Sequence, residues 1–226
     1  MRIPWLVGLL AVMSCLSPSL FGTTLKLLSL RETLAKSSRI LVGECLEFQE
    51  GFDQRGLPYT EYTFRLIERL KGDAAGRLFT VKQFGFSPES NRRSGGRGVT
   101  RIAGMPHYRP GSTYMLFLGP VSRLGFSSPV GLAQGAFRVI GQGAERRVVN
   151  GVGNRNLLID TSRTLRERIE LRRQSPQTGL VSPPSELIRG SVPYARFSGA
   201  LRRMLGGDQL DRRQLGEALS EGGSRQ

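Results

Sequence analysis

The sequence predicts a mainly β protein, a small antiparallel OB-like barrel or sandwich with a short N-terminal helix and a helical C-terminal tail. Strand-like segments follow one another at short intervals between residues 39 and 150, with turn residues between them. After about residue 155 the apolar residues recur at helical spacing, and prolines interrupt them. The 29 Gly and 12 Pro among 226 residues exclude a coiled coil. We therefore expect a β-barrel domain over 23–155 and a Pro-interrupted helical extension over 156–226.

A capping box predicts the helix that opens the domain. Ser29 and Glu32 have the spacing at which each side chain accepts a hydrogen bond from the other residue's backbone N–H. This helix is expected to end near Lys36. The strands are predicted, in chain order, at 40–48, 59–70, 78–84, 113–118, 130–132 and 136–140, after which a turn at 141–145 leads into 146–150. Helical spacing in the extension covers 164–173, 185–205, where Gly190 and Pro193 interrupt it, and 208–219.

Two of these strands indicate how their faces are used. Residues 59–70 alternate with a period of two, so one face carries Tyr62, Phe64 and Leu66. Residues 113–118 are almost wholly apolar, which predicts a central strand covered on both faces. Gly43, within the first strand, predicts a bulge or a close backbone approach.

The first 22 residues are typical of a secretory signal peptide. Arg2 provides a positive start, and residues 5–12 provide an apolar stretch too short to span a bilayer. Cleavage after Gly22 would make Thr23 the first mature residue. A lipobox-like cut before Cys15 would instead give a lipid-anchored protein, and the sequence favours the first alternative. Both predict an exported protein, periplasmic or extracellular.

No arrangement of catalytic residues is apparent, so the sequence predicts a protein that is not an enzyme and binds no cofactor or metal. His107 is the only histidine, which excludes zinc sites built from several histidines. If Cys15 leaves with the signal peptide, Cys45 can form no intramolecular disulfide, and its strand predicts a buried, inert thiol. A cryptic hydrolase is an alternative, and it would need a pocket that gathers Glu44, Glu47 or His107.

Four segments resemble a family of uncharacterised exported bacterial proteins. They read SSRILVG at 37–43, YTFRLIERLKG at 62–72, GMPHYRPG at 104–111 with YMLFL at 114–118, and PVGLAQGAF at 129–137. The same layout is similar, more distantly, to the netrin-like domain of tissue inhibitors of metalloproteinases. That resemblance implies an OB-type barrel and an exported protease as a partner. Those inhibitors chelate the protease metal through an N-terminal cysteine, which has no counterpart in a chain that begins at Thr23, so only the fold carries over.

The charge of the chain points to an anionic partner. Lys and Arg number 33 against 18 Asp and Glu, a net charge of +15, and only four of the 33 are lysine. Arginine pairs with phosphate and carboxylate in a bidentate geometry. Export favours a protein partner or an anionic envelope surface over nucleic acid, and a membrane only if Cys15 is lipidated. The candidate binding surface comprises Arg92, Arg93, Arg97, His107, Tyr108 and Arg109.

The sequence therefore predicts an exported, non-enzymatic binding module that acts through contacts with a protein or with the envelope surface. Association with an exported protease follows from the resemblance alone. A basic OB-type protein that binds single-stranded nucleic acid is the alternative, because such folds combine cationic grooves with aromatic stacking platforms.

Overall fold

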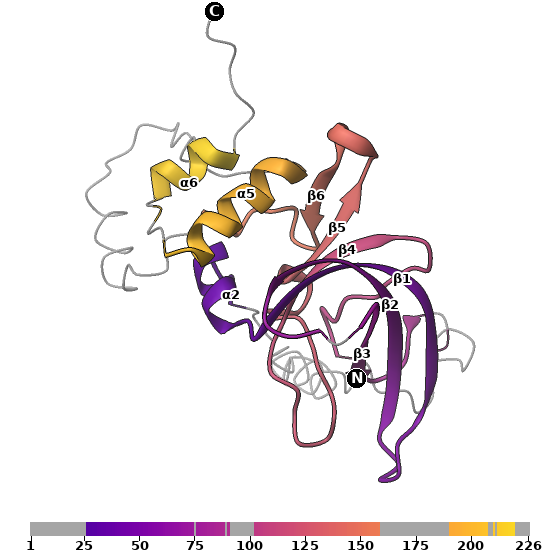
Figure 1. Ribbon diagram of the computed structural model, residues 1–226. Helices are drawn as coiled ribbons and strands as arrows, with labels where there is room; N and C mark the ends of the chain where they lie inside the picture. The colour runs from indigo at the N-terminus through magenta and orange to yellow at the C-terminus, as the bar shows by residue number, and fades with distance from the viewer. Residues whose placement is uncertain are drawn as a thin grey trace, which may run out of the picture.

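One antiparallel sheet of seven strands forms the centre of the protein. The computed structural model describes residues 26–74, 76–88, 90, 102–158, 190–207, 210 and 212–219. The strands are β1 (Arg39–Phe52), β2 (Pro58–Lys71), β3 (Leu78–Phe84), β4 (Thr113–Leu118), β5 (Ala136–Ile140), β6 (Arg147–Asn150) and β7 (Val192–Pro193). They lie in the order β3-β2-β1-β4-β5-β6-β7, with β3 and β7 at the edges (Figure 1). The fold is mainly β, and the sheet is not closed.

Three helices lie together at one side of the sheet: α2 (Leu30–Lys36), α5 (Tyr194–Leu205) and α6 (Arg212–Leu219) (Figure 1). The predicted capping box opens α2, because Ser29 Oγ accepts from the Glu32 N–H at 3.2 Å and the Glu32 carboxylate accepts from the Ser29 N–H at 2.9 Å. Helix α5 begins directly after Pro193, the residue expected to interrupt the helical pattern. The helix predicted over 164–173 lies outside the described residues.

Strand β4 separates two hydrophobic cores. Met115 and Phe117 belong to the core beneath the helices, which also contains Phe137 and Phe197. Tyr114, Leu116 and Leu118 belong to a second core with Phe64, Val81 and Tyr108. Because successive side chains of a strand point to opposite faces, the two cores lie back to back across β4. This confirms the prediction of a central strand covered on both faces.

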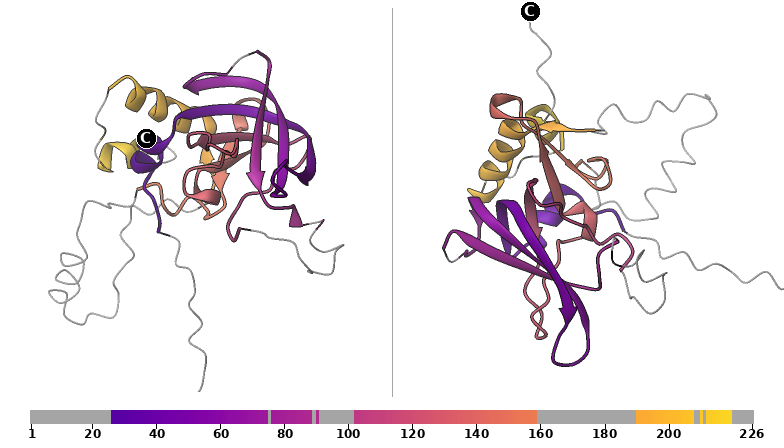
Figure 2. Two further views of the ribbon diagram at one scale, coloured as in Figure 1. Left: turned by 90° about the horizontal axis from the view of Figure 1, so that it is seen from below. Right: turned by 90° about the vertical axis from the view of Figure 1, so that its right-hand side faces the viewer.

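Bulges in β1 and β2 curl one end of the sheet around the second core (Figure 2). The pairing of β1 with β2 shifts between Val42 and Gly43 and again between Cys45 and Glu47. A Cβ atom at Gly43 would lie 2.7 Å from the Phe79 ring and 3.0 Å from the carbonyl oxygen of Arg65. The predicted close approach at Gly43 is therefore present, and it lets the β3 aromatic ring pack over β1.

The strand predicted over 130–132 is wrong. This segment makes one isolated bridge, between Leu118 and Pro129, and then turns into the 3₁₀ helix η1 (Leu132–Gln134). Gly131 has φ +67° and Leu132 has φ +58°, and two successive left-handed residues are incompatible with a strand. A second 3₁₀ helix, η2 (Gly143–Glu145), connects β5 to β6.

A network of buried amides ties the chain segments together beyond the sheet. Asn150 Nδ2 donates to Gln134 O and to Asn156 Oδ1, both at 2.9 Å. Asn156 Nδ2 donates to Leu28 O at 2.7 Å, and Asn154 Nδ2 donates to Val148 O and Gly190 O. The amide of Gln134 also pairs with the backbone on both sides of Leu27, at 2.8 and 2.9 Å. These contacts join the segment before α2, the turn after β4, strand β6 and the approach to β7.

Two alanine substitutions should change stability in opposite directions. Gly43→Ala places its methyl group against Phe79 and the β2 backbone, and we expect it to lower the free energy of unfolding by about 1–3 kcal/mol. Gly199→Ala, in α5, meets no atom within 4 Å, so the better helix propensity of alanine should raise stability by about 0.5–1 kcal/mol. Urea unfolding followed by circular dichroism measures both, and equal effects would contradict the close approach at Gly43.

Candidate functional site

Three of the predicted surface residues, His107, Tyr108 and Arg109, lie in the loop that precedes β4. The side chains of His107 and Tyr108 pack against the core. Nδ1 of His107 lies 2.8 Å from the Tyr62 hydroxyl, and its ring stands edge-on to Phe48. Tyr108 is fully buried, and its hydroxyl accepts a hydrogen bond from Gln83 Nε2 at 3.2 Å. Only Arg109 is exposed, which corrects the expectation that Tyr108 contributes to a binding surface.

Arg92, Arg93 and Arg97, the arginines of the Ser/Gly-rich loop, lie outside the described residues, as do Cys15 and the predicted signal peptide. The loop from Met105 to Gly111 is anchored to the second core. Tyr108 packs within this core, and the backbone N–H of Arg109 donates to the Tyr114 hydroxyl at 3.0 Å.

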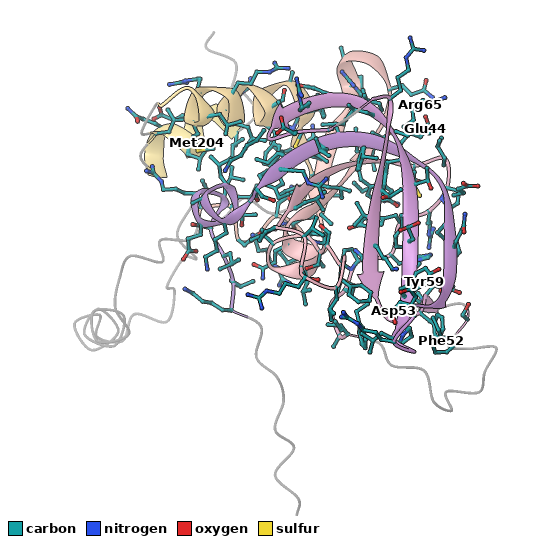
Figure 3. All side chains as sticks on the ribbon, turned by 60° about the horizontal axis from the view of Figure 1, so that its bottom comes forward. Glu44, Phe52, Asp53, Tyr59, Arg65 and Met204 are labelled. Atoms are coloured by element: carbon teal, nitrogen blue, oxygen red, sulfur yellow. The ribbon has the colours of Figure 1, made fainter. Side chains whose placement is uncertain are left out.

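Of the residues proposed for a cryptic hydrolase, Glu44 and His107 are not brought together, and Glu47 is exposed opposite Thr63 of β2. Glu44 forms an ion pair with Arg65 (Figure 3), whereas His107 contacts Tyr62. Arg65 and Tyr62 are three residues apart on β2, so they point to opposite faces of the sheet. The cavity beside His107 measures about 20 Å³, which is room for about one water. Within the described residues, no three His, Cys, Asp or Glu side chains are grouped as metal ligands.

Cys45 lies in the second core, as its strand predicted. Its side chain is fully buried, and burial raises the pKa of the thiol to about 11. Because the thiolate is the nucleophile, Cys45 is held in its unreactive form near neutral pH.

The most distinctive surface lies at the end of the sheet away from the helices. We call it the loop end: the β1–β2 hairpin tip (52–59), the residues around the end of β3 (82–86) and the loop 119–128. The hairpin tip and the loop 119–128 point the same way in Figures 1 and 2, and the Ser127 N–H donates to Lys82 O at 2.8 Å. These segments therefore form one surface.

Aromatic rings and a lysine hold the loop end together. Lys82 Nζ lies 4.0 Å from the centre of the Tyr59 ring and 5.7 Å from that of Phe126. Phe126 is edge-on to Phe84, and Phe52 is edge-on to Phe86 with the ring centres 5.2 Å apart. A cation between aromatic faces is a favourable arrangement that also keeps the charge near the surface.

The loop end exposes apolar side chains beside cations. Phe52 is 66% exposed, Val121 54% and Leu124 42%, and Figure 3 shows Phe52 at the hairpin tip. Arg55 and Arg123 are exposed in the same loops. The surface residues predicted from the sequence do not include this site. The sequence feature that could have indicated it is Phe52, a large apolar residue in an otherwise polar hairpin segment.

An acidic side chain organises the turn at the hairpin tip. Asp53 Oδ1 accepts hydrogen bonds from the backbone N–H groups of Leu57 at 2.8 Å and Arg55 at 2.9 Å. The bond from Leu57 is the largest cause of the lowered pKa of the Asp53 carboxyl. The carboxylate is thus directed at the backbone of its own turn, next to Phe52.

Comparison with known proteins gives no relative from which a function could be transferred. No protein-family model, no curated protein and no solved structure matches the chain. In the described part of the chain, no helix is long and apolar enough to cross a membrane.

Stability should fall in alkaline solution because three buried hydroxyl and thiol groups resist ionisation in the folded state. Burial raises the pKa of Cys45 to about 11 from 9.0, and the pKa values of Tyr108 and Tyr194 are also raised, chiefly by burial. As pH rises, these groups lose their protons in the unfolded chain at a lower pH than in the folded protein. The free energy of unfolding is therefore highest below about pH 9 and declines as pH rises towards 11. Urea titrations at pH 7, 9 and 10.5 measure the decline.

The control is Cys45→Ser, which removes the thiol and should make the loss of stability between pH 9 and 10.5 smaller. A wild-type protein whose stability does not change over this interval would contradict the raised pKa values.

Proposed function

We propose that this protein is an exported, non-enzymatic binding module that attaches through its loop end to an anionic surface of the cell envelope. The observation that carries the proposal is Phe52, an aromatic ring left 66% exposed on the hairpin tip beside Arg55 and Lys82. The basic composition and the signal-like first segment support it. The OB-type likeness is part of the same proposal, supported by the way β1, β2 and β3 curl over the second core.

The physical case rests on combining two weak attractions. Burying a Phe side chain in an apolar environment contributes about 1.5–3 kcal/mol when the whole side chain is transferred. Each Lys or Arg near an anionic bilayer adds about 1 kcal/mol. Arg55, Lys82 and Arg123 lie on the same segments as the apolar side chains, so the loop end offers both contributions to one surface. Aromatic rings are also well suited to the boundary between headgroups and acyl chains.

Two other occupants are the alternatives to an anionic surface. A single-stranded nucleic acid would use the same cations and would stack bases on Phe52. A protein partner, including an exported protease, would bury Phe52 as an anchor residue. The anionic surface is preferred because the apolar residues Val121 and Leu124 lie on the same end as Phe52, and base stacking makes no use of aliphatic side chains.

We expect Phe52→Ser to weaken binding to vesicles of phosphatidylglycerol and phosphatidylethanolamine about tenfold, because tenfold corresponds to about 1.4 kcal/mol of lost apolar burial. Raising the salt concentration should weaken the binding of the wild-type protein as well, because salt screens the cations. Co-sedimentation with vesicles measures both effects.

The matched control is Ile67→Ser, which removes an apolar side chain that is 51% exposed on β2. It should leave vesicle binding unchanged. Equal binding of Phe52→Ser and wild type, or binding of oligothymidylate in preference to vesicles, would overturn the proposal and, in the second case, favour the nucleic-acid alternative.

A further inference from the structure

A second hollow lies between the helices, on the side of the protein away from the loop end. It is bounded by α2, by the end of β2 and by the C-terminal end of α5, and its volume is about 370 Å³. Figure 3 shows Met204, one of its lining residues, far from Phe52. Cavities that hold small molecules begin at about 300 Å³, so this helical groove has the size of a small-ligand site.

The lining of the helical groove combines apolar and cationic side chains. The apolar part consists of Leu34, Ala35, Met204 and Leu205, and Arg31 and Lys71 supply the charges. Among the described residues that line it, none is acidic. A ligand that complements this surface therefore has an apolar body and an anionic end.

Both cations are held in position, and each has more N–H donors than its one hydrogen bond within the described residues uses. Lys71 Nζ donates to the carbonyl oxygen of Leu34 at 3.0 Å, and Arg31 Nη2 donates to that of Leu210. An ammonium has three N–H donors and a guanidinium five, so each fixed side chain has further donors for an anion. The carbonyl contacts orient the two groups, which lowers the entropy cost of binding a carboxylate.

The apolar wall is part of the main core and is formed by side chains that can adapt. Leu34 belongs to the core beneath the helices, and Met204 and Leu205 pack against it from the surface. Methionine is unbranched and fills irregular spaces readily. The wall can therefore accept a flexible alkyl chain without opening the core.

We propose that the helical groove binds a fatty acid, with its alkyl chain against Met204 and Leu205 and its carboxylate between Arg31 and Lys71. The size of the groove favours a single chain of medium length over a two-chain lipid. This site is independent of the loop end and of the proposed attachment to a surface.

The test uses decanoate, titrated into the full-length protein by isothermal calorimetry below its micelle concentration. Two comparison ligands separate the contributions: decyltrimethylammonium keeps the alkyl chain with the opposite charge, and acetate keeps the carboxylate without the chain. We expect decanoate to bind with one-to-one stoichiometry, and both comparison ligands to bind at least tenfold more weakly.

Two substitutions should locate the site. Lys71→Gln removes a charge-assisted hydrogen bond and should weaken decanoate binding about tenfold. Ala35→Phe, at an exposed position of α2, should fill the groove and abolish binding while the far-UV circular dichroism spectrum is retained. Lys36→Gln removes a neighbouring lysine that does not line the groove and should bind decanoate like wild type.

The result that would overturn the proposal is equal binding of decanoate and decyltrimethylammonium, or undiminished decanoate binding in folded Ala35→Phe. Phe52→Ser should bind decanoate normally, so a failure of the loop-end proposal and a failure of this one are distinguishable.

Discussion

The burial of β4 on both faces is the constraint on which the rest of the structure depends. A six-residue strand that alternates between two cores cannot leave either face open, because each exposed face would present large apolar side chains to water. One face is covered by the helices, and the other by the curl of β1, β2 and β3 with Tyr108 beneath it. The bulge at Gly43 makes that curl possible. Replacing a buried side chain of β4 by alanine would cost about 2–5 kcal/mol by the usual cavity cost.

The segments that connect the strands must also be fixed to the sheet and to one another. Hydrogen bonds of buried side-chain amides do this in place of apolar packing. Asn150, Asn154, Asn156 and Gln134 are each at most 5% exposed, and their hydrogen bonds reach backbone groups of segments far apart in the sequence. A buried polar group without a partner costs about 1–3 kcal/mol. The network therefore specifies one arrangement of the chain, because any shift of a connecting segment would leave several amides unpaired at once.

Local patterns in the sequence predicted the elements whose cause is local. The capping box at Ser29, the alternation of 59–70 and the apolar segment 113–118 are confirmed because hydrogen bonding and periodicity act over a few residues. The prediction of a strand at 130–132 was wrong because Leu132 has a left-handed backbone, and the apolar composition of the segment gives no sign of it. Local patterns could not decide between a closed barrel and an open sheet, because closure depends on whether the edge strands β3 and β7, which are far apart in the sequence, pair with each other. Tyr108 was predicted to lie on a surface because its loop is polar, yet its ring completes the second core. Phe52 was overlooked because a large apolar side chain is normally expected to be buried, yet its ring is exposed.

The architecture also explains why both proposed sites should favour anions. Both faces of β4 are used for packing, and the two proposed binding surfaces lie towards the ends of the sheet: the loop end and the helical groove. Carboxylates are scarce, and several already pair with cations, as Glu32 does with Lys26, Glu44 with Arg65 and Glu68 with Arg202. The 33 basic residues outnumber the 18 acidic ones by 15, so a large share of the cations have no acidic side chain to pair with. The apolar side chains of the two proposed sites therefore lie beside positive charge, and an anionic amphiphilic partner is complementary to both parts of such a surface.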